Sequence, residues 1–192
     1  MHVSLLLALL AGIGIAAACG LRAFLPLFVV GLAARTGWLQ LHAGSEWLAG
    51  DPALWALGTA TVLEVAADKV PVIDHALDAI GTVLRPVAAW VGAYAVLNGW
   101  GAPWAQIVSV VLGVGALAVH GAKAKARIGS TTLTLGHANP ALSVLEDVTT
   151  LGLIAAAILA PLAALLLVLL LVWTVWRFRR GRRVGPDMAM GG

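Results

Sequence analysis

A long apolar stretch near the start of the chain sets the first limit on the fold. Residues 3 to 34 contain a single charged side chain, that of Arg22. As one helix they would measure about 50 Å at ~1.5 Å per residue, whereas the hydrocarbon core of a bilayer is only about 30 Å thick. Gly20 and Pro26 flank Arg22, and a proline removes one backbone hydrogen bond of a helix. The stretch therefore predicts two helical pieces that meet near Arg22.

The rest of the chain is also poor in charge, and this indicates the class of protein. Hydrophobic residues make up 61% of the sequence and charged residues 11%, with a mean hydropathy of +0.97. Soluble domains contain about 45–50% apolar and about 25% charged residues. The contrast predicts an all-α polytopic membrane protein, a transmembrane bundle of about five helices with broken or re-entrant segments. We assign residues 1–176 to one transmembrane domain and residues 177–192 to a basic cytoplasmic tail.

The basic balance of the chain comes largely from this tail. The net charge is +3, and five of the twelve basic residues are arginines of the tail. A basic run directly after an apolar helix is typical of an anchor on the anionic cytoplasmic leaflet, so no nucleic-acid partner is expected. The single cysteine, Cys19, allows no internal disulfide. The expected location is a bacterial inner membrane, which the chain crosses several times.

Turn-forming residues divide the chain after residue 35 into further elements. Asp51-Pro52 places a capping residue before a proline at the first helical position, so we expect a helix from there to about Lys69. The segment before it, 36–52, is predicted to be a loop or a short interfacial helix. The elements predicted after it are a short segment at 72–80, helices at 82–98 and 104–121, turns at 128–139, and a helix from Asn139-Pro140 to Trp176 that kinks at Pro161.

Two predicted helix breaks resemble each other. The first contains Gly20 and Pro26, and the second, in the other half of the chain, contains Gly136, Asn139 and Pro140. Broken helices in corresponding halves are typical of transporters built from inverted repeats, whose binding site lies near the breaks. Because the two halves share no further similarity, an inverted repeat is one possible interpretation of this pattern.

The densest group of charges lies between residues 64 and 86. Its carboxylates are Glu64, Asp68, Asp74 and Asp78, and its basic residues are Lys69, His75 and Arg85. Glu64 and Asp68 are four residues apart, as are Asp74 and Asp78, so each pair shares one face if its segment is helical. Two carboxylates on one face repel each other unless a cation, a proton or a basic side chain lies between them. Charges beside hydrocarbon are costly, so we expect them to pair, line water or act on something.

Further charges occur in the second half, at Lys123, Lys125 and Arg127 and at Glu146 and Asp147. If the tail is inside, counting the spans backwards places both of these groups and the 64–86 cluster outside. That side is the wrong one for the three basic residues, unless acidic partners hold them. The counter-charges expected to balance the six carboxylates are Arg22, Lys69, Arg85, Lys123, Lys125 and Arg127.

Two interpretations of the carboxylates remain open. In the first, Glu64 and Asp68 bind a cation or a proton. The residues expected to complete this vestibule are Asp74, Asp78, Glu146 and Asp147. In the second, Glu64 and Asp68 form salt bridges to Lys123 or Arg127 that only fix the packing of helices. The spacing of the histidines predicts no transition-metal site, no cofactor is expected, and whether the carboxylates hold a metal is left open.

The leading functional hypothesis is a small transporter or channel for an ion, either a cation or a proton, or for a small polar solute. One alternative is a membrane-embedded enzyme that acts on a lipid headgroup through a divalent metal, so enzyme activity is an open question and the less favoured answer. Another is a structural protein of a membrane assembly. A monomer of this size has little interior to shield so many charges, so we expect a homodimer in the lipid bilayer.

The sequence of residues 64–78, EVAADKVPVIDHALD, followed by Arg85-Pro86, resembles a bacterial membrane family catalogued as domain of unknown function 4126. The second half agrees in HGAKAKAR at 120–127 and NPALSVLED at 139–147. The resemblance covers most of residues 10 to 165, and the arginine-rich tail lies outside it. It implies an integral membrane protein of a few helices and no particular activity.

Overall fold

The structure, a computed structural model, describes residues 5–68, 71–134, 137 and 139–181. The elements in this described part are seven α-helices and one short 3-10 helix: α1 (Leu5–Leu21), α2 (Phe24–Arg35), η1 (Glu46–Ala49), α3 (Asp51–Ala67), α4 (Pro71–Val96), α5 (Trp104–Thr134), α6 (Asn139–Leu159) and α7 (Pro161–Gly181). No strand occurs among them, which confirms the all-α prediction, although the helices outnumber the five expected.

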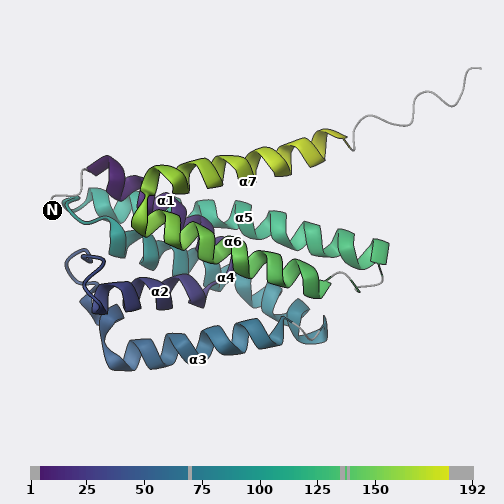
Figure 1. Cartoon of the computed structure of the whole chain (residues 1–192), viewed down its shortest axis with the longest axis horizontal. Helices are drawn as coiled ribbons and strands as arrows, with labels where there is room; N and C mark the ends of the chain where they lie inside the picture. Colours follow the sequence, from purple (N-terminus) through teal and green to yellow (C-terminus); the bar gives the residue numbers. More distant parts are fainter. Residues whose placement is uncertain (1–4, 69–70, 135–136, 138, 182–192) are drawn as a thin grey trace, which may run out of the picture.

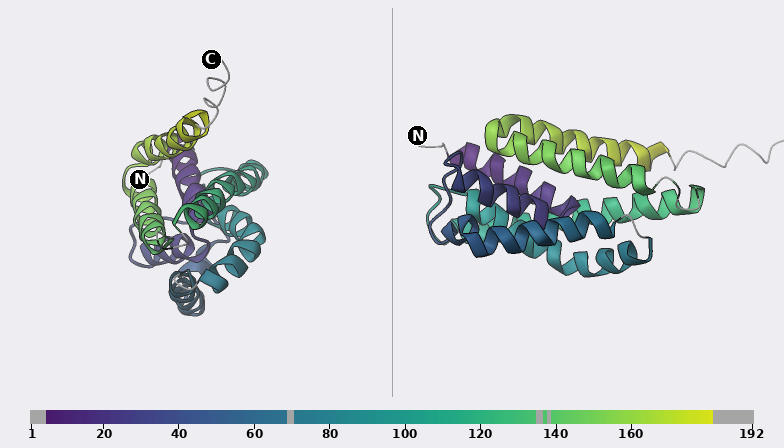
Figure 2. Two further views of the ribbon diagram at one scale, coloured as in Figure 1. Left: turned by 90° about the vertical axis from the view of Figure 1, so that its right-hand side faces the viewer. Right: turned by 60° about the horizontal axis from the view of Figure 1, so that its bottom comes forward.

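Helix α1 lies at the centre of the bundle and contacts α4, α5, α6 and α7. The end-on view in Figure 2 shows it enclosed by its neighbours. Most of its residues are buried on every side, because its sequence is apolar all round rather than along one stripe. Small residues such as Ala18 and Cys19, both fully buried, let the surrounding helices pack closely against it.

The predicted break at Arg22 is confirmed. Helix α1 ends at Leu21 and α2 begins at Phe24, running back toward the end where the chain starts (Figure 1). Pro26 lies in the first turn of α2, where its missing N–H leaves no helical hydrogen bond unmade. Helices α1 and α2 thus form a hairpin whose tip contains Arg22.

The structure corrects two predicted boundaries. Helix α4 is one helix from Pro71 to Val96 rather than a short segment at 72–80 followed by a helix at 82–98, and it continues through Pro86. Helix α5 does not end near residue 121 but runs through the predicted turn region to Thr134. The hydroxyls of Thr132 and Thr134 donate to backbone carbonyls one turn earlier, at Ile128 and Ser130, so these polar residues fit within a helix.

The predicted single helix from Asn139 to Trp176 is also wrong. The chain reverses at Ala160, so that α6 and α7 are antiparallel neighbours rather than two halves of a kinked span (Figure 1). The end of α5, the start of α6 and the end of α7 therefore lie at the same end of the molecule. The structure thus has two helices where one was predicted, and the basic residues 123–127 of α5 lie at the same end as Arg177. We call this the tail end.

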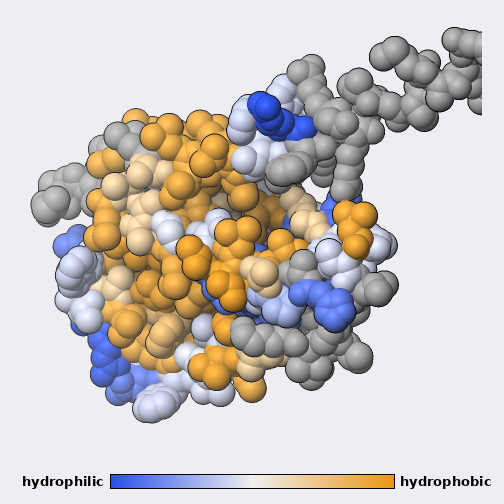
Figure 3. All heavy atoms as spheres, turned by 45° about the vertical axis from the view of Figure 1, so that its right-hand side comes forward, coloured by the Kyte–Doolittle hydropathy of each residue, from blue (hydrophilic) through white to orange (hydrophobic). Residues whose placement is uncertain are grey.

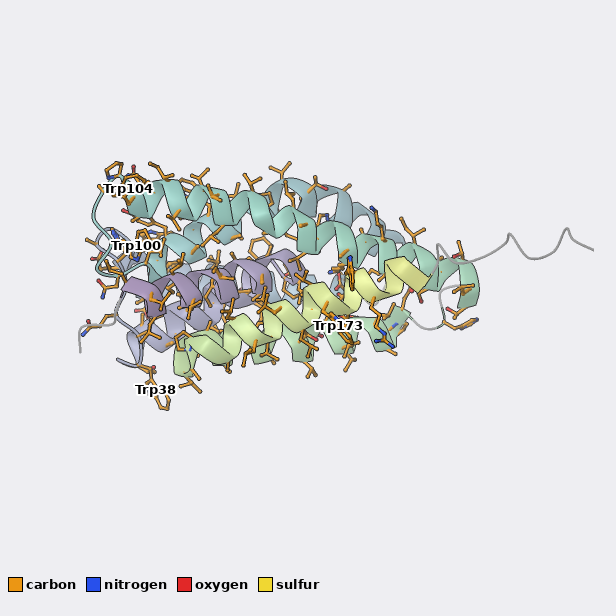
Figure 4. The ribbon with its side chains drawn as sticks, turned by 90° about the horizontal axis from the view of Figure 1, so that it is seen from above. Trp38, Trp100, Trp104 and Trp173 are labelled. Atoms are coloured by element: carbon orange, nitrogen blue, oxygen red, sulfur yellow. The ribbon has the colours of Figure 1, made fainter. Side chains whose placement is uncertain are left out.

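The outside of the bundle is apolar. Within the described residues, Ala79–Val96, Trp104–Thr134 and Asn139–Leu159 are helical segments long and apolar enough to cross a membrane. Side chains such as Val111 and Leu166 are mostly exposed, and hydrophobic residues cover most of the face shown in Figure 3. Figure 4 places Trp38, Trp100 and Trp104 together at one end, as a membrane interface requires. The protein is a membrane protein.

Substituting Gly20 tests the packing of the hairpin tip. A Cβ atom at Gly20 would lie 2.7 Å from Cβ of Val119 and 2.8 Å from the carbonyl oxygen of Ala116, both on α5. Because these atoms cannot give way, Gly20→Ala should force α1 away from α5 and lower the free energy of unfolding by about 1–3 kcal/mol. Thermal unfolding in detergent measures the loss, and Gly115→Ala, where a Cβ atom meets nothing within 4 Å, is the matched control with little expected effect.

Candidate functional site

A buried network of charged side chains surrounds the tip of the α1–α2 hairpin. It joins the hairpin to the end of α3, to α5 and to α6. Its members are the carboxylates Glu64, Asp68, Glu146 and Asp147, the cations Arg22, Lys123 and Arg127, and the hydroxyl of Ser143. Residues that are distant in sequence thus meet because the break between α1 and α2, the end of α3 and one face each of α5 and α6 converge.

Arg22 is the central cation of the network and is fully buried. Its guanidinium forms an ion pair with Asp68 of the α3 end and donates a 3.1 Å hydrogen bond to Oγ of Ser143 on α6. A second ion pair, 2.7 Å long, joins it to Asp147, also on α6. Arg22 therefore binds the tip of the hairpin to α3 and α6 at once.

Glu64 and Lys123 stabilise the two helix ends at the break, the start of α2 and the end of α1. The carboxylate of Glu64 accepts hydrogen bonds from the backbone N–H groups of Ala23, at 2.9 Å, and Phe24, at 3.2 Å, where α2 begins. The ammonium of Lys123 donates to the carbonyl oxygen of Leu21, at 3.1 Å, where α1 ends. Each charge is opposite in sign to the partial charge of the helix end that it meets, so both contacts are favourable.

Arg127 and Lys123 of α5 hold the other carboxylates. The guanidinium of Arg127 forms a two-pronged pair with Glu146, at 3.0 and 2.7 Å, and donates to Asp68 at 3.0 Å. The ammonium of Lys123 lies 3.0 Å from Glu146 and 3.9 Å from Asp68. Both carboxylates are thus bound by two or more cations each, an arrangement that offsets the cost of burying them.

Asp147 is the most weakly held carboxylate of the network. Its side chain is 22% exposed, against 2% for Asp68 and 13% for Glu146. Among the described contacts its one partner is Arg22, and its Oδ1 atom meets the guanidinium as a close ion pair without a well-aligned hydrogen bond. Among the described residues, four carboxylates face three cations here, so this part of the network has one more carboxylate than cations.

Arg85, predicted as a counter-charge, is buried on α4 and contacts His120 of α5. Because a guanidinium can only donate, it must donate to Nδ1 of His120, which leaves the proton of the neutral ring on Nε2. Nε2 lies 3.4 Å from Oγ1 of Thr82, which can accept that proton in a hydrogen bond.

Other predicted residues have different outcomes. The structure does not describe Lys69 or the side chains of Asp74 and Asp78. Lys125 is exposed and forms no ion pair within the described part of the chain. Asn139 and Pro140 stand at the start of α6, between two helices rather than inside a broken one, and Asn139 donates to Oγ1 of Thr131 at 3.0 Å. No group of three or more His, Cys, Asp and Glu side chains in the described residues could hold a metal ion.

Three contributors were not predicted as site residues: Ser143, His120 and the backbone groups at the break. A signal existed for the two side chains. His120 precedes Lys123 by three residues and Arg127 by seven, so the three share one face of α5. Ser143 precedes Glu146 by three residues on α6 in the same way. The backbone groups carry no sequence signal, because every residue has them.

Comparisons with known proteins place the chain in a family without giving it an activity. No curated protein and no solved structure matches the chain significantly. The family model described as domain of unknown function DUF4126 matches residues 9–180, which include every member of the charged network. The chain therefore belongs to the DUF4126 family, as the resemblance of its charged motifs predicted.

Proposed function

We propose that the protein is a small membrane transporter or channel for a proton or a cation, or for a small solute that moves with one. The observation that carries this proposal is that, among the described residues, the buried network has four carboxylates and three cations. An unneutralised carboxylate in a surrounding of low dielectric constant favours binding a proton or a cation. A site that binds and releases a proton or cation inside a membrane protein is a working part of many transporters.

Asp147 is the group that would exchange the proton or cation. It is the most exposed carboxylate of the network and the one with the fewest partners. This proposal changes the roles expected from the sequence. Glu64 and Asp68, first expected to bind the transported ion, become positioning residues, because backbone N–H groups and two arginines already occupy their oxygens.

Exchange at Asp147 would act on more than one helix. When Asp147 is neutralised, its attraction for Arg22 weakens, and Arg22 also holds Asp68 and Ser143. The hairpin tip, α3 and α6 meet at this one guanidinium, so a change in charge there can shift the balance between two arrangements of these elements. Broken helix ends at a binding site serve such movements in known transporter folds.

The orientation of the protein forms part of the proposal. Lys123, Lys125, Arg127 and Arg177 all lie at the tail end. The positive-inside rule then favours a cytoplasmic tail end, in an inner membrane crossed several times, without the conflict that the earlier span count produced.

Flux into liposomes tests the proposal. Purified protein in liposomes should dissipate an imposed gradient of protons, sodium ions or potassium ions, measured with ion-sensitive dyes trapped inside. Asp147→Asn keeps the shape of the side chain and removes its charge, so flux should fall to that of protein-free liposomes. Asp51→Asn is the matched control, because Asp51 forms an exposed ion pair with Arg35, far from the network, and its loss should leave flux unchanged.

The outcomes of this experiment test the role of Asp147 separately from ion transport itself. Asp147→Asn must keep the thermal midpoint of the wild type within a few degrees for its flux to be interpreted. Full flux in this folded variant would remove Asp147 from the mechanism. A wild-type protein that carries none of the three ions would contradict proton and cation transport altogether.

A structural role in a membrane assembly is the second candidate, and the close pairing of the network favours it. Asp68 and Glu146 are nearly enclosed and each has cationic partners. Buried pairs of this kind can serve only to fix the arrangement of helices. This candidate predicts no flux for any ion, so the liposome experiment distinguishes the two functions.

A further inference from the structure

A cavity of about 650 Å³ lies between α5, α6 and α7, toward the tail end. Its walls are largely apolar, from Leu117 on α5, Leu145 on α6, and Leu171 and Trp176 on α7. Its polar lining includes Lys123 and Lys125 of α5. The cavity therefore combines a hydrocarbon-like wall with the exposed ammonium group of Lys125, and the transport proposal does not make use of it.

The depth of the cavity can be estimated along α5. This helix begins at Trp104, at the end where the tryptophans gather (Figure 4). At ~1.5 Å per residue, Leu117 lies about 20 Å from Trp104 and Lys125 about 31 Å from it. The hydrocarbon core is about 30 Å thick. The apolar wall thus lies at the level of acyl chains, and Lys125 at the level of the headgroups on the tail side.

The charges around the cavity favour an anion. Lys125 is exposed and has no carboxylate partner within the described residues. The lining carboxylate, Glu146, is already neutralised by Lys123, at 3.0 Å, and by Arg127, at 2.7 Å. A negatively charged group that enters the cavity would meet the exposed ammonium of Lys125, while Lys123 and Glu146 already neutralise each other.

We infer that this cavity binds an anionic membrane lipid of the tail-side leaflet. The lipid phosphate lies at Lys125, and the upper part of an acyl chain lies along Leu117 and Leu171. Trp176 stands at the headgroup level, where an amphipathic indole ring is stable. The inference does not rest on transport, but the shared residue Lys123 joins the lipid site to the charged network.

Quenching of tryptophan fluorescence by brominated lipid tests the site. The full chain is placed in neutral phosphatidylcholine membranes with a rising fraction of brominated phosphatidylglycerol or, in parallel, of brominated phosphatidylcholine. The anionic lipid should quench at a several-fold lower fraction than the neutral lipid. The extra quenching should be lost in Trp176→Phe, which removes the reporter from the cavity.

Variants distinguish the site from general attraction to the surface. Lys125→Gln should weaken the preference for the anionic lipid about fivefold, which corresponds to ~1 kcal/mol for one basic residue at an anionic surface. Ala126→Phe, at an exposed position of the cavity lining, should reduce it by filling the space. Arg35→Gln, which removes an exposed cation at the other end, should leave it unchanged.

Three results would overturn the inference. The first is equal quenching by the two brominated lipids, and the second is an unchanged preference in both Lys125→Gln and Ala126→Phe. The third is loss of the extra quenching when millimolar inorganic phosphate is added, because a lipid seated by its chain should resist a free anion. The third result would identify a site for small phosphate-like anions instead.

Discussion

Arg22→Met should nearly abolish the folded protein. Methionine has a similar volume and no charge, so the substitution removes the ion pairs to Asp68 and Asp147 without leaving a large cavity. Removing one partner of a buried pair leaves an uncompensated charge and costs about 3–5 kcal/mol, which is a large share of the ~5–15 kcal/mol that stabilises a typical domain. We expect little folded protein in detergent extracts, measured by size-exclusion chromatography and by unfolding in a denaturing detergent.

Two further variants test this explanation. Arg35→Met removes an exposed arginine that pairs with Asp51, and exposed pairs contribute only about 0–1 kcal/mol, so its effect should be small. Adding Asp147→Asn to Arg22→Met neutralises the carboxylate that lost its cation, and this should restore part of the stability. If the double variant is no more stable than Arg22→Met alone, the loss does not come from the unpaired charge of Asp147.

The elements that could be predicted from the sequence are those whose residues are compatible with only one local structure. A charged residue flanked by glycine and proline in an over-long apolar stretch leaves few alternatives to a break, and the break is at Arg22. Asp51-Pro52 starts α3 for a similar reason, since both residues favour the same helix position. The position of Ala160-Pro161 is different, because a proline in an apolar run fits a kink or a reversal equally well.

That one ambiguity has a large effect on topology. A kink at Pro161 gives one span after Asn139, whereas a reversal gives two antiparallel helices. The reversal moves residues 123–127 from the side opposite the tail to the same side, which turns a violation of the positive-inside rule into agreement with it. The conflict with that rule was therefore a signal that the number of helices predicted after Asn139 was wrong.

The members of the charged network could be predicted more readily than their partners. In an apolar chain each buried charge must find a partner, so the small number of charged residues was enough to indicate Arg22, Glu64 and Asp68. Sequence spacing could not show that Arg22 sits beside Asp147, which is 125 positions away in a different helix. Nor could it show that Glu64, predicted to bind an ion, uses its oxygens on backbone N–H groups instead.

Glu64→Leu should therefore destabilise the hairpin tip rather than merely remove an ion site. The carboxylate accepts from two N–H groups, those of Ala23 and Phe24, which begin α2 and have no earlier turn to bond with. Each buried donor left without a partner costs about 1–3 kcal/mol, so the two together make this one of the most damaging single changes in the chain. Unfolding in a denaturing detergent measures the loss of stability.

Hydrogen exchange locates that loss. In Glu64→Leu the amide protons of residues 23 and 24 should exchange much faster than in the wild type, while those at the middle of α6 should change little. Glu64→Gln retains one acceptor oxygen without the charge, so its loss of stability and its gain in exchange should be intermediate. Glu46→Leu is the control, because Glu46 accepts from the N–H of Gly44 in an exposed loop where water can replace it.

A different outcome would reassign Glu64. If Glu64→Leu leaves both stability and exchange at the hairpin tip unchanged, then the carboxylate is not needed to hold the start of α2. Its oxygens would then be available to an ion, as the first interpretation of the sequence proposed. If the variant also loses flux in liposomes while it remains folded, the ion site belongs at Glu64, and Asp147 has no special place in the network.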